Sequence, residues 1–95
     1  MAAALLARAD LERLKWRSRR GMLENDLVLQ TFYARHQASL TEGDAAGLGE
    51  VLDLIDWDLW DVISLRKELG DVVAAPSAAA QQIIALLRAC EAAKQ

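Results

Sequence analysis

Residues 22–36, MLENDLVLQTFYARH, carry the apolar spacing that decides the fold. Val28, Leu29, Phe32 and Tyr33 recur at intervals of three and four residues, which places them on one face of a helix. Most of the stability of such a helix comes from packing its apolar face against other elements. The stretch therefore predicts a helix over about residues 22–36 that lies in the core of a helical domain.

A first helix is expected before this stretch, over about residues 4–19. Its apolar residues Leu5, Leu11 and Leu14 fall near one face. Gly21 follows, and a glycine at this place is expected to end or kink the helix because it adopts positive φ without strain.

A third helix is expected after a short connection at residues 37–40. Thr41 is a candidate N-cap, followed by acids that favour the positive end of the helix dipole. The apolar stripe of this helix comprises Leu48, Val51, Leu52 and Ile55. Gly47 and Gly49 each weaken it by about 1 kcal/mol relative to alanine, so packing has to hold it together.

Two more helices complete the expected fold. The fourth is short, is capped by Asp56 or Asp58, contains Leu59, Trp60, Ile63 and Leu65, and ends near Gly70. The last opens at Pro76 and Ser77, and its apolar stripe comprises Ala80, Ile83, Ile84, Leu87 and Cys90.

The sequence therefore predicts an all-α fold, a small bundle of five helices that forms one domain over residues 1–95 with flexible extreme termini. Aromatic residues make up only 5% of the chain, which disfavours a sheet. The residues expected to be largely buried are Phe32, Leu52, Leu59, Ile63, Ile84 and Leu87.

Charge is distributed unevenly along the chain, whose net charge is −3. Residues 1–36 hold seven Lys or Arg against four Asp or Glu, whereas residues 37–75 hold two against nine. This predicts a basic end and an acidic end, and thus oriented association with a partner. Solvated helix faces commonly carry such runs as well, so the pattern alone leaves both readings open.

The basic stretch RLKWRSRR, residues 13–20, is followed directly by Gly21. Its cations and Trp16 could contact phosphates and stack on a base, which makes a small nucleic-acid-binding regulator the alternative function. The acidic pI near 5.0 opposes that reading. Trp16 could instead pack against neighbours or lie under Arg20, and Arg20 could pair with Glu24 if the helix continues across Gly21. A glycine flanked by these charges indicates a recognition surface that a partner approaches closely.

Catalytic and metal-binding arrangements are not evident. His36 and Cys90 are single residues on different expected helices. The acids Asp53, Asp56, Asp58 and Asp61 lack the central glycine of an EF-hand loop, and no dinucleotide-binding glycine motif follows a strand. We therefore expect no catalytic residue, no metal and no tightly bound cofactor. The chain has no apolar run of roughly 18 to 20 residues, so membrane insertion is not expected. The expected location is the bacterial cytoplasm, with the mitochondrial matrix as the alternative.

The motif W-x-x-R-R-G-M-x-E-x-D resembles the SdhE (YgfY) family of succinate dehydrogenase assembly factors, also called flavinylation factors. Its residues here are Trp16, Arg19, Arg20, Gly21, Met22, Glu24 and Asp26. Phe32 and Tyr33 resemble the aromatic pair of the family, and a second segment resembles it through Leu52, Asp56, Asp58 and Leu59. The resemblance covers about residues 11–70. Asn25 and Val62 depart from it, since members usually carry an aliphatic residue and often a tryptophan there.

The resemblance implies an assembly factor or chaperone, not an enzyme. Such a protein binds the flavoprotein subunit of succinate dehydrogenase, and in bacteria also of fumarate reductase, and promotes covalent attachment of FAD to that subunit. A monomer when free and a transient FAD contact through the partner are expected on this basis. The residues expected to contact the partner are Trp16, Arg19, Arg20, Gly21, Met22, Glu24, Asp26, Asp56 and Asp58.

Overall fold

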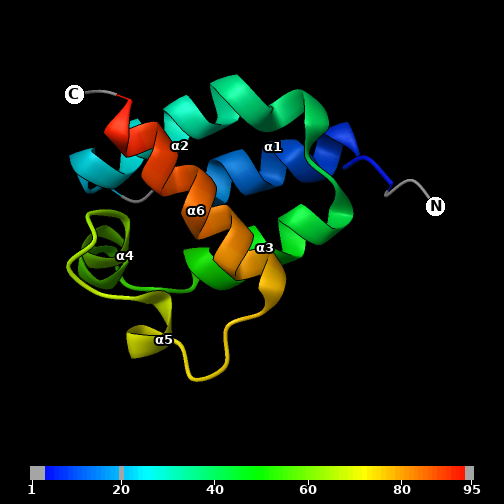
Figure 1. Ribbon diagram of the computed structural model, residues 1–95. Coiled ribbons are helices and arrows are strands. Elements are labelled where there is room, and N and C mark those ends of the chain that lie inside the picture. The colour runs from blue at the N-terminus through cyan, green and yellow to red at the C-terminus, as the bar shows by residue number, and fades with distance from the viewer. Residues whose placement is uncertain (1–3, 20, 94–95) are drawn as a thin grey trace.

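Figure 1 shows the computed structural model of the chain, which describes residues 4–19 and 21–93. The described residues form six α-helices and one short 3-10 helix, and contain no sheet. These elements are α1 (Arg8–Arg17), α2 (Leu23–His36), η1 (Gln37–Ser39), α3 (Glu42–Leu52), α4 (Asp56–Ile63), α5 (Leu69–Val72) and α6 (Ala78–Ala92). The prediction of an all-α fold is confirmed.

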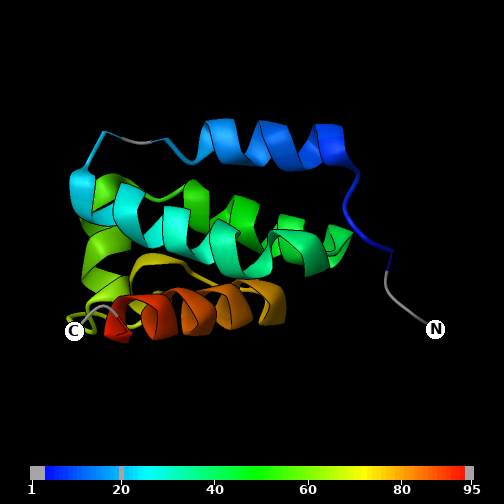
Figure 2. The same ribbon diagram turned by 90° about the horizontal axis from the view of Figure 1, so that it is seen from above.

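The helices are arranged so that α6 and α1 lie on opposite sides of α2 and α3. The most extensive contact joins α3 to α6, and α6 also packs on α2 and α4. In Figure 2, α1 forms an outer layer on one side of α2 while α6 lies on the other side. α1 contains no buried residue, so it covers the bundle without contributing to the centre of the core.

The apolar stripes of α2 and α6 are buried as the sequence predicts. Val28, Leu29, Phe32 and Tyr33 of α2 are all buried, and so is the whole stripe of α6. The six residues expected in the core are confirmed there, none with more than 5% exposure: Phe32, Leu52, Leu59, Ile63, Ile84 and Leu87. The spacing of apolar residues was sufficient to identify these faces.

The predicted N-cap at Thr41 is confirmed, and Ser77, predicted only to open the last helix, is the N-cap of α6. The side chain of Thr41 accepts a hydrogen bond from the backbone N–H of Asp44, whose carboxylate in turn accepts from the N–H of Thr41. Ser77 caps α6 by accepting from the N–H of Ala80 at 3.0 Å. The carboxylate of Glu50, on α3, accepts hydrogen bonds from the hydroxyl and the N–H of Ser77, which ties the start of α6 to α3.

The start of the chain differs from the prediction, because α1 begins at Arg8 and not near residue 4. The N–H of Leu6 donates to the carbonyl of Leu40, and the N–H of Glu42 donates to the carbonyl of Ala4. These partners replace the hydrogen bonds that another helical turn would supply. Leu5 is consequently outside the helix and 64% exposed, so its predicted place in an apolar stripe is wrong.

The region around α4 also differs from the prediction. Ile55, expected in the stripe of the third helix, is instead the N-cap of α4 and is exposed, while neither Asp56 nor Asp58 provides a side-chain cap. Leu65 follows the end of α4 with a positive φ of 70°. Gly70 lies inside α5 and does not end a helix. Glu68 and Asp71 form a capping box that starts α5, a short helix that was not expected from the sequence.

Gly47 allows the close approach of α3 to α6. A Cβ at this position would lie 2.5 Å from the backbone carbonyl carbon of Ala79 and 2.8 Å from its Cβ. These distances are far below van der Waals contact, and a backbone cannot move aside as a flexible side chain does. Gly47 weakens α3 as an isolated helix, but it makes possible the close contact of α3 with α6.

We predict that Gly47→Ala destabilises the protein by about 1–3 kcal/mol, because the added methyl group forces α3 and α6 apart. Gly43→Ala is the matched control, since a Cβ there meets only the Thr41 hydroxyl at 3.7 Å. Urea denaturation followed by circular dichroism measures both variants. Equal stability of the two would contradict the role assigned to Gly47.

Candidate functional site

A groove of about 870 Å³ lies between α1 and α2. Four of the predicted partner-contact residues line it: Trp16, Arg19, Gly21 and Asp26. Glu12 and Lys15 contribute from α1, and Leu29, Gln30, Tyr33 and Ala34 from α2. The structure thus brings the two ends of the Trp16–Asp26 motif to one surface, although the residues belong to different helices.

A hydroxyl pair lies at this groove, where Ser18 meets Tyr33. The two oxygens are 2.6 Å apart, and the Ser18 hydroxyl also lies 2.7 Å from the carbonyl oxygen of Leu14. A carbonyl only accepts, so the Ser18 proton points to Leu14 and Tyr33 donates to Ser18. Burial raises the pKa of Tyr33, although the Ser18 hydroxyl and the nearby charge of Arg17 act in the opposite direction.

Trp16 and Arg19 form a stacked pair on the rim of the groove. Trp16 is 72% exposed, so the expectation that it packs against neighbours is wrong. The guanidinium carbon of Arg19 lies 5.2 Å from the centroid of the Trp16 ring, within the range of a cation–π contact. Arg20, which the sequence suggested for this contact, lies outside the described residues.

Gly21 lies in the segment that connects α1 to α2. It has a φ of +88°, and a Cβ built on it would meet no atom within 4 Å among the described residues other than its chain neighbours. Because α1 ends at Arg17 and α2 begins at Leu23, helical geometry does not continue across Gly21. The predicted i,i+4 pair between Arg20 and Glu24 required a helix that continues across Gly21, and this condition is not met. Glu24 is exposed in the first turn of α2.

A smaller hollow, of about 360 Å³, lies beside the C-terminal end of α1. It is lined by Arg17, Arg19, Ile55 and Asp56. Arg17 also forms an ion pair with Asp53. The C-terminal end of the basic segment therefore meets the acidic segment at this corner, where opposite charges face each other across the contact between α1 and the α3–α4 connection.

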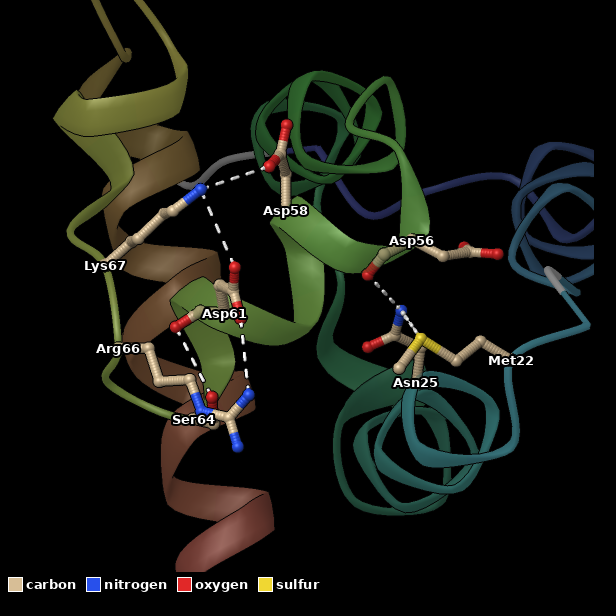
Figure 3. Close-up of polar contacts among 8 residues, drawn as sticks. All are labelled: Met22, Asn25, Asp56, Asp58, Asp61, Ser64, Arg66 and Lys67. Atoms are coloured by element: carbon tan, nitrogen blue, oxygen red, sulfur yellow. Dashed lines mark hydrogen bonds and ion pairs between the residues drawn. The ribbon is translucent and has the colours of Figure 1, made fainter.

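Asn25 joins the first turn of α2 to the start of α4, as Figure 3 shows. Its side chain is completely buried, and its Nδ2 donates to the backbone carbonyl of Asp56 at 2.9 Å. The same nitrogen lies 3.5 Å from the sulfur of Met22, which is the N-cap of α2. The Oδ1 atom of Asn25 has no hydrogen-bond partner among the described residues.

Asp58 faces away from this contact. In Figure 3, Asp58 and Asp61 point toward Lys67, at 3.5 and 3.6 Å from its Nζ atom. Arg66 adds a further cation 3.7 Å from Asp61. Of the two acids predicted for the partner surface in this segment, the structure therefore places Asp56 near the Arg19 side and Asp58 in a separate charge cluster.

The residues considered for catalysis or metal binding are not brought together. Cys90 is buried in α6, and the His36 ring lies against Phe32 with centroids 5.3 Å apart. Among residues 4–19 and 21–93, no three His, Cys, Asp or Glu side chains gather in a way that could hold a metal ion. No helix in the same ranges is long and apolar enough to span a bilayer.

Sequence reasoning missed three features of this surface. Ser18 was unassigned because a serine near a helix end gives no signal of a tertiary hydrogen bond. Ile55 was assigned to a buried stripe that ends before it, and Trp57 was left without a role. Only the break between α3 and α4 exposes these two residues beside Asp56.

Comparison with known proteins identifies the family. Residues 12–91 match the family model Sdh5, described as flavinator of succinate dehydrogenase. The chain therefore belongs to this family, and the match extends beyond residues 11–70 to include most of α6. No solved structure matches the chain.

Named relatives agree with this assignment. The FAD assembly factor SdhE of Ralstonia nicotianae is 39% identical over 77 residues, which is 81% of this chain and 79% of the relative. The protein of the same name from Legionella pneumophila is 34% identical over 82 residues, 86% of this chain and 95% of the relative. The mitochondrial succinate dehydrogenase assembly factor 2-A of Drosophila erecta is 42% identical over 52 residues, 52% of this chain and 32% of that protein.

We predict that folded Tyr33 ionises at a higher pH than the same tyrosine in urea. Its folded pKa is raised above its ordinary value of 10.0, so the stability it contributes is complete below that pH and is lost as the pH rises through the folded pKa. The chain has a single tyrosine, so tyrosinate absorbance reports this group alone. Equal midpoints in the folded and unfolded states would contradict the burial of the hydroxyl, and Tyr33→Phe should lack the transition.

A further prediction concerns the half-satisfied amide of Asn25. We expect Asn25→Leu to leave stability unchanged or to raise it by about 1 kcal/mol, because a buried polar atom without a partner costs about 1–3 kcal/mol and a typical hydrogen bond contributes about 1. Thermal unfolding of the two proteins tests this. A large loss of stability would show that the bond to Asp56 outweighs the unpaired oxygen.

Proposed function

We propose that this protein is an FAD assembly factor that binds the flavoprotein subunit of succinate dehydrogenase and promotes covalent attachment of FAD to that subunit. Family membership supports the role in succinate dehydrogenase assembly. The fumarate reductase flavoprotein is proposed as a second partner, and the free protein as a monomer. The compartment proposed is the bacterial cytoplasm, with the mitochondrial matrix as the alternative.

The geometry of Gly21 carries the proposal for where the partner docks. The backbone at Gly21 is exposed, and, its chain neighbours aside, no described atom lies within 4 Å of the place that a Cβ would occupy. A neighbouring protein could therefore approach the main chain here without displacing more distant residues of the part of the chain that the structure describes. Arg19 precedes this opening and Glu24 follows it, so charges of both signs are available for contacts with the partner.

Promotion of flavin attachment needs no reactive group on this chain. If the covalent bond forms between FAD and a side chain of the flavoprotein, the assembly factor has only to hold that subunit in a productive geometry. Positioning of reactants can supply several kcal/mol of barrier reduction by itself. We propose that no cofactor is held tightly by this protein and that any contact with FAD is transient and made through the partner.

The proposed contact residues form one surface with two parts. Trp16, Arg19, Gly21 and Asp26 belong to the groove, while Met22 and Asp56 lie beside the buried amide of Asn25. Arg20 and Glu24 complete the motif by sequence. Asp58 is retained only at the periphery, since its pairing with Lys67 directs it away from this surface.

Nucleic-acid binding through the basic N-terminal stretch is not favoured. Arg17 is paired with Asp53 and Arg13 with Asp10, so two of its cations already have carboxylate partners. A phosphate backbone would have to compete with these acids. The family model that matches residues 12–91 describes a flavinator of succinate dehydrogenase.

We predict that Gly21→Arg abolishes flavinylation of the partner subunit in a co-expression assay, because a long side chain fills the open space over the main chain. Both Gly21→Arg and Gly21→Ala place a non-glycine residue at positive φ, at a cost of about 1–2 kcal/mol. Gly21→Ala is therefore the control for backbone strain without bulk. Covalent flavin per subunit is read from fluorescence of the denatured subunit, beside the melting temperature.

Glu24→Ala provides a second variant without backbone strain. Glu24 is exposed in the first turn of α2, so its truncation should change stability by less than about 1 kcal/mol. We expect the loss of this contact in a desolvated interface to weaken binding by roughly thirtyfold or more. Full flavinylation supported by both Gly21→Arg and Glu24→Ala would refute the docking role of this segment.

A further inference from the structure

We propose that Ile55 and Trp57 are apolar contact residues of the surface on which the flavoprotein subunit docks. This inference rests on the function proposed above. It adds a second part to the docking surface, located where the chain passes from α3 to α4. The first part is the segment around Arg19 and Gly21, called here the Arg-Gly segment. The partner would present an apolar side chain flanked by a carboxylate to this corner.

The exposure of these two side chains has no structural explanation within the described part of the chain. Ile55 is 66% exposed and Trp57 is 65% exposed, although both are large and apolar. α4 is anchored by other residues of its own, Leu59, Val62 and Ile63, which are all buried. Tryptophan is the residue type most enriched among those that dominate protein interfaces, because it buries a large area with few rotatable bonds.

The corner is continuous with the Arg-Gly segment. Ile55 and Asp56 line the same hollow as Arg17 and Arg19. Arg17 is engaged with Asp53, whereas Arg19 forms no ion pair with any residue that the structure describes and contacts the ring of Trp16. A carboxylate of the partner placed beside Ile55 would therefore meet an available guanidinium, which defines the chemistry of the expected contact.

Asn25 holds the corner in place relative to the start of α2. Its buried amide donates to the carbonyl of Asp56, the residue between the two apolar side chains. Shielding from water makes this bond a rigid link between the two parts of the surface. An interface whose parts are fixed before binding loses less conformational entropy on association, so the surface is preorganised.

The test compares Trp57→Ala with Leu5→Ala, which removes another exposed apolar side chain, at the opposite end of α1. Leu5 is 64% exposed, so the two variants are matched in accessibility. Affinity for the purified flavoprotein subunit without covalent flavin is measured by calorimetry, for wild type, both variants and Ile55→Ala. We expect Trp57→Ala to weaken binding at least tenfold, Ile55→Ala to weaken it severalfold, and Leu5→Ala to have no effect, with melting temperatures unchanged.

The outcomes separate this inference from the proposed function. If wild type and Trp57→Ala bind the subunit equally while Gly21→Arg does not bind, only the role of the corner is overturned. If wild type does not bind at all, the proposed function fails, and this inference fails with it. Self-association of wild type that Trp57→Ala abolishes, seen by sedimentation, would assign the corner to a second copy of the chain and overturn the proposal.

Discussion

The close contact of α3 with α6 at Gly47 is the constraint on which the rest of the structure depends. The absence of a Cβ lets the backbone of α3 approach Ala79, and Glu50 fixes the start of α6 through Ser77. α2 packs its apolar stripe on the same helix, α6. Once these three helices are placed, the apolar faces of the chain are buried, and α1 has to cover the bundle from outside.

The outer position of α1 shapes the functional surface. With no buried residue of its own, α1 is held by Leu11 and Leu14 against the core and by polar contacts of Arg17 and Ser18 at its C-terminal end. Looser packing of this kind leaves a groove between α1 and α2. The surface proposed for docking is therefore a consequence of how weakly the first helix is buried.

Asn25 shows how a buried polar group can be retained against its cost in stability. Its amide nitrogen is bonded to Asp56, while its oxygen has no partner among the residues described. An apolar side chain of similar size would avoid the unpaired atom. What the amide provides is a directional bond between the first turn of α2 and the start of α4, two of the places that carry proposed contact residues.

The sequence by itself determined the helical class, the buried faces of α2 and α6, the cap at Thr41, and the motif that relates the chain to its family. These features depend on neighbours three or four residues apart, which a sequence displays directly. Only the tertiary structure decided the late start of α1, the break that exposes Ile55, the short α5, and the meeting of Arg17 and Asp53. Each of these depends on contacts between residues distant in sequence, where backbone hydrogen bonds and ion pairs outweigh local preference.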